Sequence, residues 1–214
     1  MAITEFVLPT FKQVPESATA FTTTIAPFLS NLVDNHATPP KLKRFGKVIL
    51  ENGKDVTGDF RPCLGIEWEQ ASDFTTLLTT PGFATFKTLV QPYATAPPNL
   101  QLYETDFGPS DVFGSSLTEV WQVKVGDGPD AEGKVEEARS AWEGFVGAVT
   151  GEVSGMGKGI QGTSLNQEER LWIGVLGWES SEAREKVLGS APVKEAKKIL
   201  DGLVWKTFVA SFAQ

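Results

Sequence analysis

Hydrophobic and polar positions over residues 115–214 change between a strand-like and a helix-like pattern. Apolar and β-branched residues are dense over 117–125 and 171–179, and turn residues bound these runs, which is typical of strands. Over 131–149, apolar side chains recur at helical spacing with charged residues between them, which predicts an amphipathic helix. Two more strands are expected at 158–165 and 204–213, and Ser181 is expected to cap a helix over 182–200 that Pro192 interrupts.

The same order is predicted for the first part of the chain. Strands are expected at 4–11, 44–51, 63–69 and 100–107, and helices at 16–35 and 72–90. Each part is therefore predicted to run strand, helix, strand, strand, helix, strand, which is the ferredoxin-like β-α-β-β-α-β arrangement of an α+β fold.

Short sequences recur in the same order in the two parts. Residues 3–7 (ITEFV) return as 117–121 (LTEVW), and residues 66–69 (IEWE) return as 176–179 (LGWE). The offsets are 114 residues for the first segment and 110 for the second, so only loop-sized length changes separate the copies. We therefore expect two pseudo-symmetric units, a first unit at 1–108 and a second unit at 115–214, connected through turn residues that begin at Gly108.

Charge and composition exclude several classes of partner and of binding site. The 214 residues include 19 Lys and Arg against 27 Asp and Glu, a net charge of −8, which argues against nucleic acid and against an anionic membrane surface as partners. One Cys and one His exclude Cys-rich zinc sites and most His-based metal sites, so we expect no metal. The chain has no run of 18 apolar residues and no signal-peptide pattern, and with its single thiol this favours a cytoplasmic protein.

The two Trp-containing junctions resemble those of a known superfamily. Residues 68–74 (WEQASDF), followed by 81–83 (PGF), resemble the strand-to-helix junction of the dimeric α/β-barrel superfamily. Residues 178–182 (WESSE) repeat the junction, and 192–193 (PV) keep part of the later element. Over nearly its whole length the chain is similar to the antibiotic-biosynthesis-monooxygenase-like branch, in a tandem form.

This resemblance implies a fold and several functions. The sheets of the two units would meet face to face as a barrel with helices outside, as an internal pseudo-dimer in a monomer or as part of a homodimer. Members of the superfamily include cofactor-independent oxygenases of aromatic polyketides, polyketide cyclases, haem-degrading enzymes and stress-responsive proteins, and their sites usually lie between sheet and helices. The resemblance therefore implies a small hydrophobic or aromatic ligand, and we expect no cofactor.

Three residues are candidates for acid–base chemistry. His36, the only imidazole, could be a general base or a ligand, but it also stands where the first helix is expected to end, and a cation there suits the helix dipole. Arg61 and Glu67 share one face of a predicted strand with Cys63, and on a covered strand they would need partners or a polar cavity. The alternative is that Arg61 lies at an exposed strand start and that Cys63 is a small buried hydrophobe.

Aromatic residues are the candidates for substrate binding, because indole and phenol rings can line a pocket for a flat molecule. They are Trp68, Trp121, Trp172, Trp178, Tyr93 and Tyr103. Each of them also fits a plain core position. Trp121 stands at the repeat position of Val7, so the two units differ there.

Glu5 and Glu119 occupy equivalent positions on the first strand of each unit. They could form an acid–base pair across the barrel, or they could bind Lys or Arg residues that fix how the sheets meet. The second role is favoured.

Two functions stay open. The first is an enzyme that acts on an aromatic or polyketide-like molecule by cofactor-independent oxygenation or by cyclisation, with His36 or a carboxylate as the base. The second is a non-catalytic small-molecule-binding or stress-responsive protein of the same fold. An enzyme needs a cavity with a converging acid or base, whereas an interaction protein does not.

Overall fold

The computed structural model describes residues 1–153, 159–167 and 169–212, so the predicted strand ends at Lys158 and Ala213 lie outside the described residues. The first unit contains β1 (Ala2–Leu8), α1 (Pro15–Ala20), the π-helix η1 (Phe21–Ile25), α2 (Ala26–Asp34), β2 (Leu42–Glu51), β3 (Lys54–Asp55), β4 (Pro62–Trp68), α3 (Ala71–Leu78), α4 (Pro81–Val90) and β5 (Asn99–Thr105). A short helix, α5 (Ser110–Phe113), leads into the second unit, which contains β6 (Leu117–Lys124), α6 (Ala131–Glu152), β7 (Ile160–Ser164), β8 (Leu171–Trp178), α7 (Ser181–Leu188), α8 (Ala191–Asp201) and β9 (Val204–Phe212). Both units show the predicted β-α-β-β-α-β order, which confirms the fold class.

The helices differ in detail from the prediction. The helix predicted at 16–35 contains the π-helical turn η1, and the helix predicted at 72–90 divides at Pro81. Proline suits the first turn of α4 because it has no N–H group to continue α3. In the second unit the N-cap is Ser180 rather than Ser181, and its Oγ accepts a backbone hydrogen bond at 3.1 Å.

Within the described residues, eight strands form one closed barrel. They follow the order β2-β4-β1-β5-β7-β8-β6-β9, β2 also pairs with β9, and β3 extends the sheet beside β2. Glu5 of β1 lies opposite Ile66, and Glu119 of β6 lies opposite Leu176, so β1 and β6 have equivalent places in their units. The pairings β5–β7 and β2–β9 join the two units into one barrel. The unit boundaries 1–108 and 115–214 stay a prediction.

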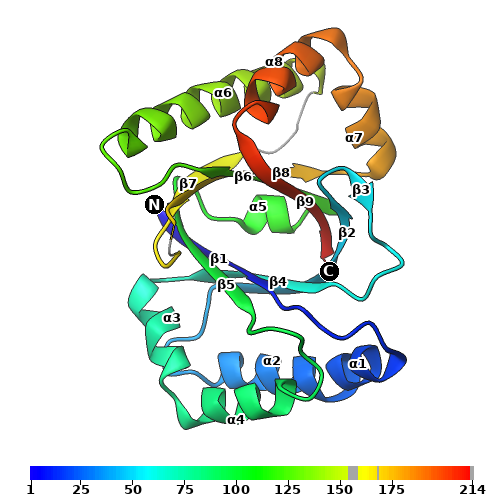
Figure 1. Cartoon of the computed structure of the whole chain (residues 1–214), viewed down its shortest axis with the longest axis vertical. Coiled ribbons are helices and arrows are strands. Elements are labelled where there is room, and N and C mark those ends of the chain that lie inside the picture. The colour runs from blue at the N-terminus through cyan, green and yellow to red at the C-terminus, as the bar shows by residue number, and fades with distance from the viewer. Residues whose placement is uncertain (154–158, 168, 213–214) are drawn as a thin grey trace.

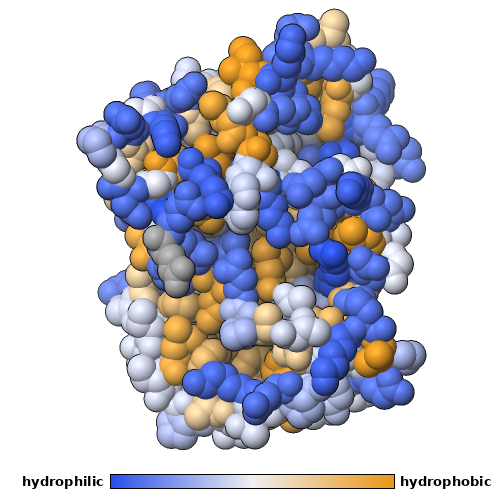
Figure 2. All heavy atoms as spheres, in the orientation of Figure 1, coloured by the Kyte–Doolittle hydropathy of each residue, from blue (hydrophilic) through white to orange (hydrophobic). Residues whose placement is uncertain are grey.

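Helices cover the outside of the barrel. Figure 1 shows α1 to α4 along the sheet of the first unit and α6 to α8 along the sheet of the second unit. Successive side chains of a strand point to opposite faces, so Val7 of β1 packs toward the helices and Phe6 packs inside the barrel. On the face in Figure 2, hydrophilic residues predominate at the upper end, over the second unit, and hydrophobic residues are exposed in the central part. Among the described helices, none is both long and apolar enough to cross a membrane.

The segment between the units enters the barrel. The sequence predicts only a connection at this point, but α5 lies between the two sheets (Figure 1). The ring of Phe113 lies 5.4 Å from that of Phe6 and 5.0 Å from that of Phe212, measured between centroids. Gly65 leaves room for this ring, because a Cβ there would lie 2.6 Å from Phe113. This part of the barrel interior is therefore filled by protein.

Candidate functional site

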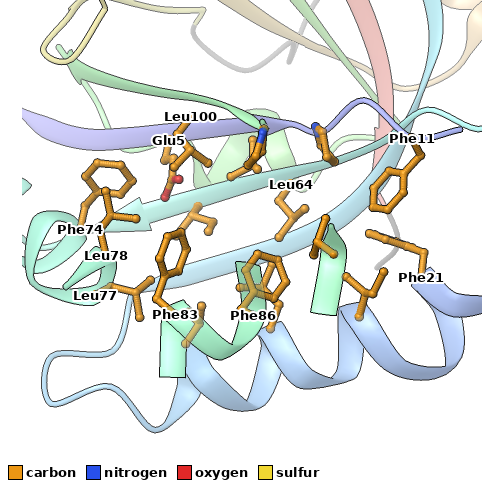
Figure 3. A pocket seen from close by; sticks show the side chains of 18 residues that line it. Glu5, Phe11, Phe21, Leu64, Phe74, Leu77, Leu78, Phe83, Phe86 and Leu100 are labelled. Carbon is orange, nitrogen blue, oxygen red and sulfur yellow. The ribbon is translucent and has the colours of Figure 1, made fainter. Parts of the chain in front are cut away.

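The first unit contains a small apolar cavity between its sheet and its helices, which we call the first-unit cavity. Its volume is about 40 Å³, and Glu5 is the one carboxyl group among the described residues that line it. Figure 3 shows the Glu5 side chain pointing from β1 into the space beside Phe74, Leu78 and Phe83. The arrangement places one acid in otherwise hydrocarbon surroundings.

Glu5 is buried and carries a shifted pKa. Glu5 is 3% exposed, and Trp68 Nε1 donates a hydrogen bond to its Oε2 at 2.7 Å. Among the described residues, no cation forms an ion pair with it. Burial disfavours the charged form and raises the pKa of Glu5 to about 7, although the hydrogen bond from Trp68 opposes this shift. A carboxyl group that titrates near neutral pH can both take and return a proton.

The equivalent Glu119 has a different environment. Arg184 donates from Nε to Oε2 at 2.6 Å and from Nη2 to Oε1 at 2.5 Å, and Trp178 Nε1 donates to Oε2 at 3.0 Å. This two-point contact pairs the Glu119 side chain with a guanidinium cation and adds geometric specificity to the ion pair. The predicted cation partner is therefore present for Glu119, although it comes from helix α7 and not from the opposite sheet. For Glu5 the prediction is wrong, because no cation of the described residues pairs with it.

One sequence difference explains why the surroundings of Glu5 and Glu119 differ. Phe74 and Arg184 each stand six residues after the Trp of the junction, so the first unit has a phenyl ring where the second has a guanidinium group. Phe74 lines the first-unit cavity, and it cannot neutralise Glu5. This difference is visible when the two repeats are compared. The sequence offers an acid–base role for Glu5 only as a pair with Glu119, and the structure instead gives the two carboxyl groups different surroundings.

The corresponding space in the second unit is filled by indole rings. Trp121 takes the place of Val7, and its ring lies 5.3 Å from that of Trp142 and 5.2 Å from that of Phe145. Gly174 leaves room for Trp142, since a Cβ there would lie 2.5 Å from the indole. The second unit therefore has a packed core where the first unit has a cavity and a carboxyl group.

The helix over the first-unit cavity is irregular. Phe21 and Ile25 line the cavity and are the first and last residues of the π-helix η1. Its counterpart α6 runs without interruption over Ala131–Glu152. Because π-helical turns occur frequently at functional sites, η1 is a second sign that the first unit carries the site.

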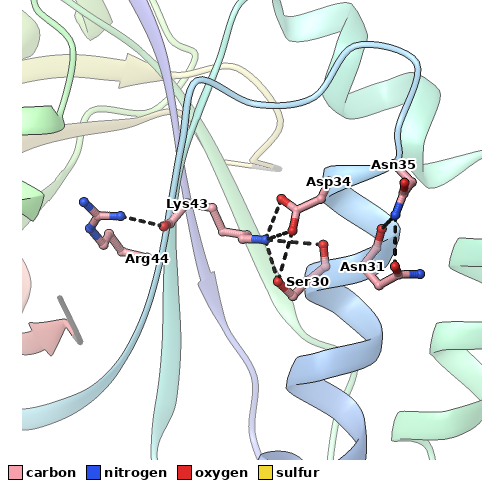
Figure 4. A network of polar contacts seen from close by, with 6 residues as sticks. All are labelled: Ser30, Asn31, Asp34, Asn35, Lys43 and Arg44. Carbon is pink, nitrogen blue, oxygen red and sulfur yellow. Dashed lines mark hydrogen bonds and ion pairs between the residues drawn. The ribbon is translucent and has the colours of Figure 1, made fainter.

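A lysine fixes the covering helix to the sheet beside the cavity. Lys43 of β2 donates to both carboxylate oxygens of Asp34 at 2.7 Å and to Ser30 Oγ at 2.6 Å (Figure 4). Ser30 and Asp34 belong to α2, which supplies Leu29 and Val33 to the cavity lining. The network therefore holds α2 at a defined distance from β2.

Replacing Lys43 by Met is expected to lower the free energy of unfolding by about 1–2 kcal/mol, because its side chain is mostly buried and its charged hydrogen bonds go to α2. Urea unfolding followed by tryptophan fluorescence measures the change. Lys41→Met is the matched control, since Lys41 forms an exposed ion pair with Glu69. An equal loss in both variants would contradict a special role for the Lys43 network.

The structure does not bring the three predicted catalytic residues together. His36 follows α2, its Nδ1 lies 3.1 Å from Thr38 O, and its ring meets Trp68 edge-on at 6.3 Å. Arg61 precedes β4 and forms ion pairs with Glu51 and Asp59. Glu67, at the other end of β4, lies against Gly108, and burial raises its pKa. Their catalytic roles stay predictions.

The predicted aromatic residues fall into different regions. Trp68 contacts the site directly through its hydrogen bond to Glu5, whereas Trp121, Trp172 and Trp178 are buried in the second-unit core. Tyr103 lies inside the barrel, where its hydroxyl donates to Gln101 at 3.2 Å and accepts from Gln122 at 2.9 Å. Tyr93 packs against the small core that contains Phe11 and Phe21. Trp68 is thus the member of the set that lies closest to the candidate chemistry.

Comparisons with known proteins identify the fold. No protein-family model and no curated protein matches the chain. Among solved structures, an anthrone oxidase-like protein is similar over 100% of this chain and 92% of its own, with 16% identity and a TM-score of 0.66. A proposed monooxygenase from Fusobacterium nucleatum is similar over 100% of this chain and 93% of its own, with 11% identity and a TM-score of 0.60. Another proposed monooxygenase, from Lactobacillus acidophilus, has 12% identity and a TM-score of 0.52 over 99% of this chain and 93% of its own.

These likenesses extend over the whole length of the chain, but their identities are low, so they define the fold rather than an activity. They agree with the closed antiparallel barrel and its outer helices. The chain has the dimeric α/β-barrel fold, with both units of the barrel in one polypeptide.

Proposed function

We propose that this protein is an enzyme that removes a proton from a small aromatic or polyketide-like molecule and that Glu5 is the base. The observation that carries the proposal is the buried Glu5 carboxyl group, which faces an apolar cavity with a pKa of about 7. A base works best when its pKa is close to the working pH, and burial without a cation is a known way to bring a carboxyl group there.

The contacts of Glu5 suit this role. Trp68 Nε1 holds Oε2, and no donor to Oε1 is recorded in the described part of the chain. Oε1 would accept the proton from a C–H group next to a carbonyl, and the resulting carbanion would be stabilised by the aromatic rings of the substrate itself. The carbanion would then add molecular oxygen and take back the proton as a hydroperoxide, which loses water so that one oxygen atom stays as a new carbonyl. Alternatively, it would attack a carbonyl of the same molecule, which gives cyclisation. The name of the similar anthrone oxidase-like protein supports the first reaction.

Substrate binding requires the first-unit cavity to expand. Its volume of about 40 Å³ is well below the roughly 150 Å³ of a cavity that holds benzene. Phe83 and Phe86 of α4 and the irregular turn η1 form its outer wall, so an outward movement of these groups would provide the space. Binding and helix movement are therefore coupled in the proposed cycle.

A non-catalytic ligand-binding protein is the second candidate, and the small volume of the cavity together with the absence of a second acid or base among its described lining residues favours it. Incubation with anthrone separates the two. An enzyme consumes oxygen and forms anthraquinone in proportion to protein concentration, whereas a binding protein shifts its tryptophan fluorescence without oxygen uptake.

The rate of the proposed reaction is expected to increase with pH. Because Glu5 must be ionised to accept a proton, kcat/KM for anthrone is expected to rise with pH, with a midpoint near 7, and to level off above it. Oxygen uptake between pH 5.5 and 9, corrected for the uncatalysed reaction in each buffer, measures the profile. A rate that is flat across this range would rule out Glu5 as the base.

A further inference from the structure

A second, larger recess lies where the two units meet, and we call it the barrel-mouth cleft. Its volume is about 480 Å³. Apolar side chains from both units line part of it, among them Leu8 of β1, Val48 of β2 and Phe208 of β9. The seam between β2 and β9 thus contributes an apolar surface that is large enough for part of a small molecule.

Cations from both units converge on this cleft. Arg61 Nη1 donates to Glu51 Oε2, and Lys206 Nζ lies 2.7 Å from Glu51 Oε1. Arg61 Nε also lies 3.4 Å from Asp59. The described lining residues include three cations, with Lys12 as the third, and two carboxylates, Glu51 and Asp59. The cleft therefore has a cationic excess in a chain whose net charge is −8.

These cations have donors left for a ligand. A guanidinium group carries five N–H donors and an ammonium group carries three. Within the described residues, one hydrogen bond is recorded for the Arg61 guanidinium group, and the one ion pair of Lys206 is with Glu51. About a third of the Arg61 side chain and a quarter of the Lys206 side chain are exposed, so an anion in the cleft can reach both.

The barrel-mouth cleft adjoins the first-unit cavity. Pro9 and Phe11 line both of them. The Phe11 ring lies 5.7 Å from Phe21, which lines the cavity, and 5.4 Å from Phe60, which lines the cleft. The two spaces are therefore separated by Pro9 and by aromatic rings, and they share these residues as a common wall.

We propose that the barrel-mouth cleft binds the acidic group of the ligand, with Arg61 and Lys206 as its anchors, while the apolar part of the same ligand enters the first-unit cavity. Pro9 stands four positions after Glu5, just beyond the end of β1, which corresponds to about 13 Å of extended chain. The ligand class is thus an elongated aromatic acid. This inference rests on the proposed function for the place of the apolar part, and it adds the charge of the ligand and the residues that recognise it.

Two dyes that share one ring system test the role of charge. 8-Anilinonaphthalene-1-sulfonate carries a sulfonate on the same rings as the neutral N-phenyl-1-naphthylamine. Fluorescence titrations give a Kd for each dye with the full chain. Arg61→Gln/Lys206→Gln is expected to weaken binding of the sulfonate dye at least tenfold and to change binding of the neutral dye less than twofold. An unchanged affinity for the sulfonate dye, or an equal loss for both dyes, would overturn the proposal.

Two further variants complete the test. Glu51→Gln removes the carboxylate that forms ion pairs with both Arg61 and Lys206, so it is expected to tighten binding of the sulfonate dye at least threefold. Weaker binding of this dye would contradict the proposed role of the two cations. Arg139→Gln/Lys197→Gln removes the same charge from exposed helix ion pairs and should leave both affinities unchanged. Glu5→Gln should preserve the charge preference of the cleft, so a loss of turnover in that variant reports on the proposed function alone.

Discussion

Replacing Glu5 by Gln is expected to lower kcat/KM for anthrone at least a hundredfold, because the amide cannot accept the proton and general base catalysis contributes about 10²–10⁴-fold. The amide keeps the size of the side chain and an oxygen that can accept the Trp68 hydrogen bond. Oxygen uptake under identical conditions measures the loss. Glu104→Gln, on the neighbouring strand β5, is the matched control and should keep wild-type activity. A Glu5→Gln variant with more than a third of wild-type activity would end the case for Glu5 as the base.

The same variant is expected to change the pH dependence of stability. The pKa of Glu5 in the folded state, about 7, is above the ordinary glutamate value of 4.5, so this group stabilises the folded state most at low pH. That contribution is fully present below about pH 4.5 and is lost as the pH rises to about 7. With about 1.4 kcal/mol for each pH unit, the loss amounts to about 3 kcal/mol. Urea unfolding at pH 5 and pH 8 should show this decrease in the wild type and not in Glu5→Gln. Equal decreases in both proteins would mean that Glu5 titrates normally.

Replacing Arg184 by Met is expected to lower the free energy of unfolding by about 3–5 kcal/mol, since it leaves the buried Glu119 carboxylate without its cation. Trp178 would still donate one hydrogen bond, which cannot replace a guanidinium group. Urea unfolding at pH 7.5 measures the effect. The double variant Arg184→Met/Glu119→Gln should recover most of the loss, because it removes the unpaired charge.

An exposed ion pair provides the comparison for Arg184. Arg139→Met breaks the contact with Glu136 on the surface of α6, and a loss within about 0.5 kcal/mol is expected. If Arg184→Met lowered the free energy of unfolding no more than Arg139→Met, the buried contact between Arg184 and Glu119 would not be the stabilising interaction proposed here.

The order of strands and helices could be predicted from the sequence, because each of them has its own local spacing of apolar residues. The repeated segments around Glu5 and Glu119 also placed equivalent positions correctly, and the replacement of Val7 by Trp121 indicated where the units differ. These features depend on residues close together in the chain, or on a comparison of two copies. Such information is present in a single sequence.

Other features depend on contacts between distant segments. The short helix α5 is stabilised inside the barrel by Phe6, Phe212 and the space above Gly65, and none of these is near it in sequence. The burial of Glu5 against Phe74 is of the same kind. The barrel-mouth cleft requires the pairing of β2 with β9, which joins residues about 160 positions apart, such as Lys47 and Ser211. Local sequence patterns do not predict these contacts between distant segments.

The unequal surroundings of Glu5 and Glu119 have a consequence for how such a protein can evolve. In an assembly of identical subunits, each substitution appears in every copy, so a phenylalanine at the Arg184 position would leave two buried carboxylates without a cation. In one polypeptide with two units, the ion pair of the second unit can be retained while the first unit diverges. One copy can then supply rigidity and the other can acquire new chemistry, so that gene fusion permits a division of labour that a symmetric dimer forbids.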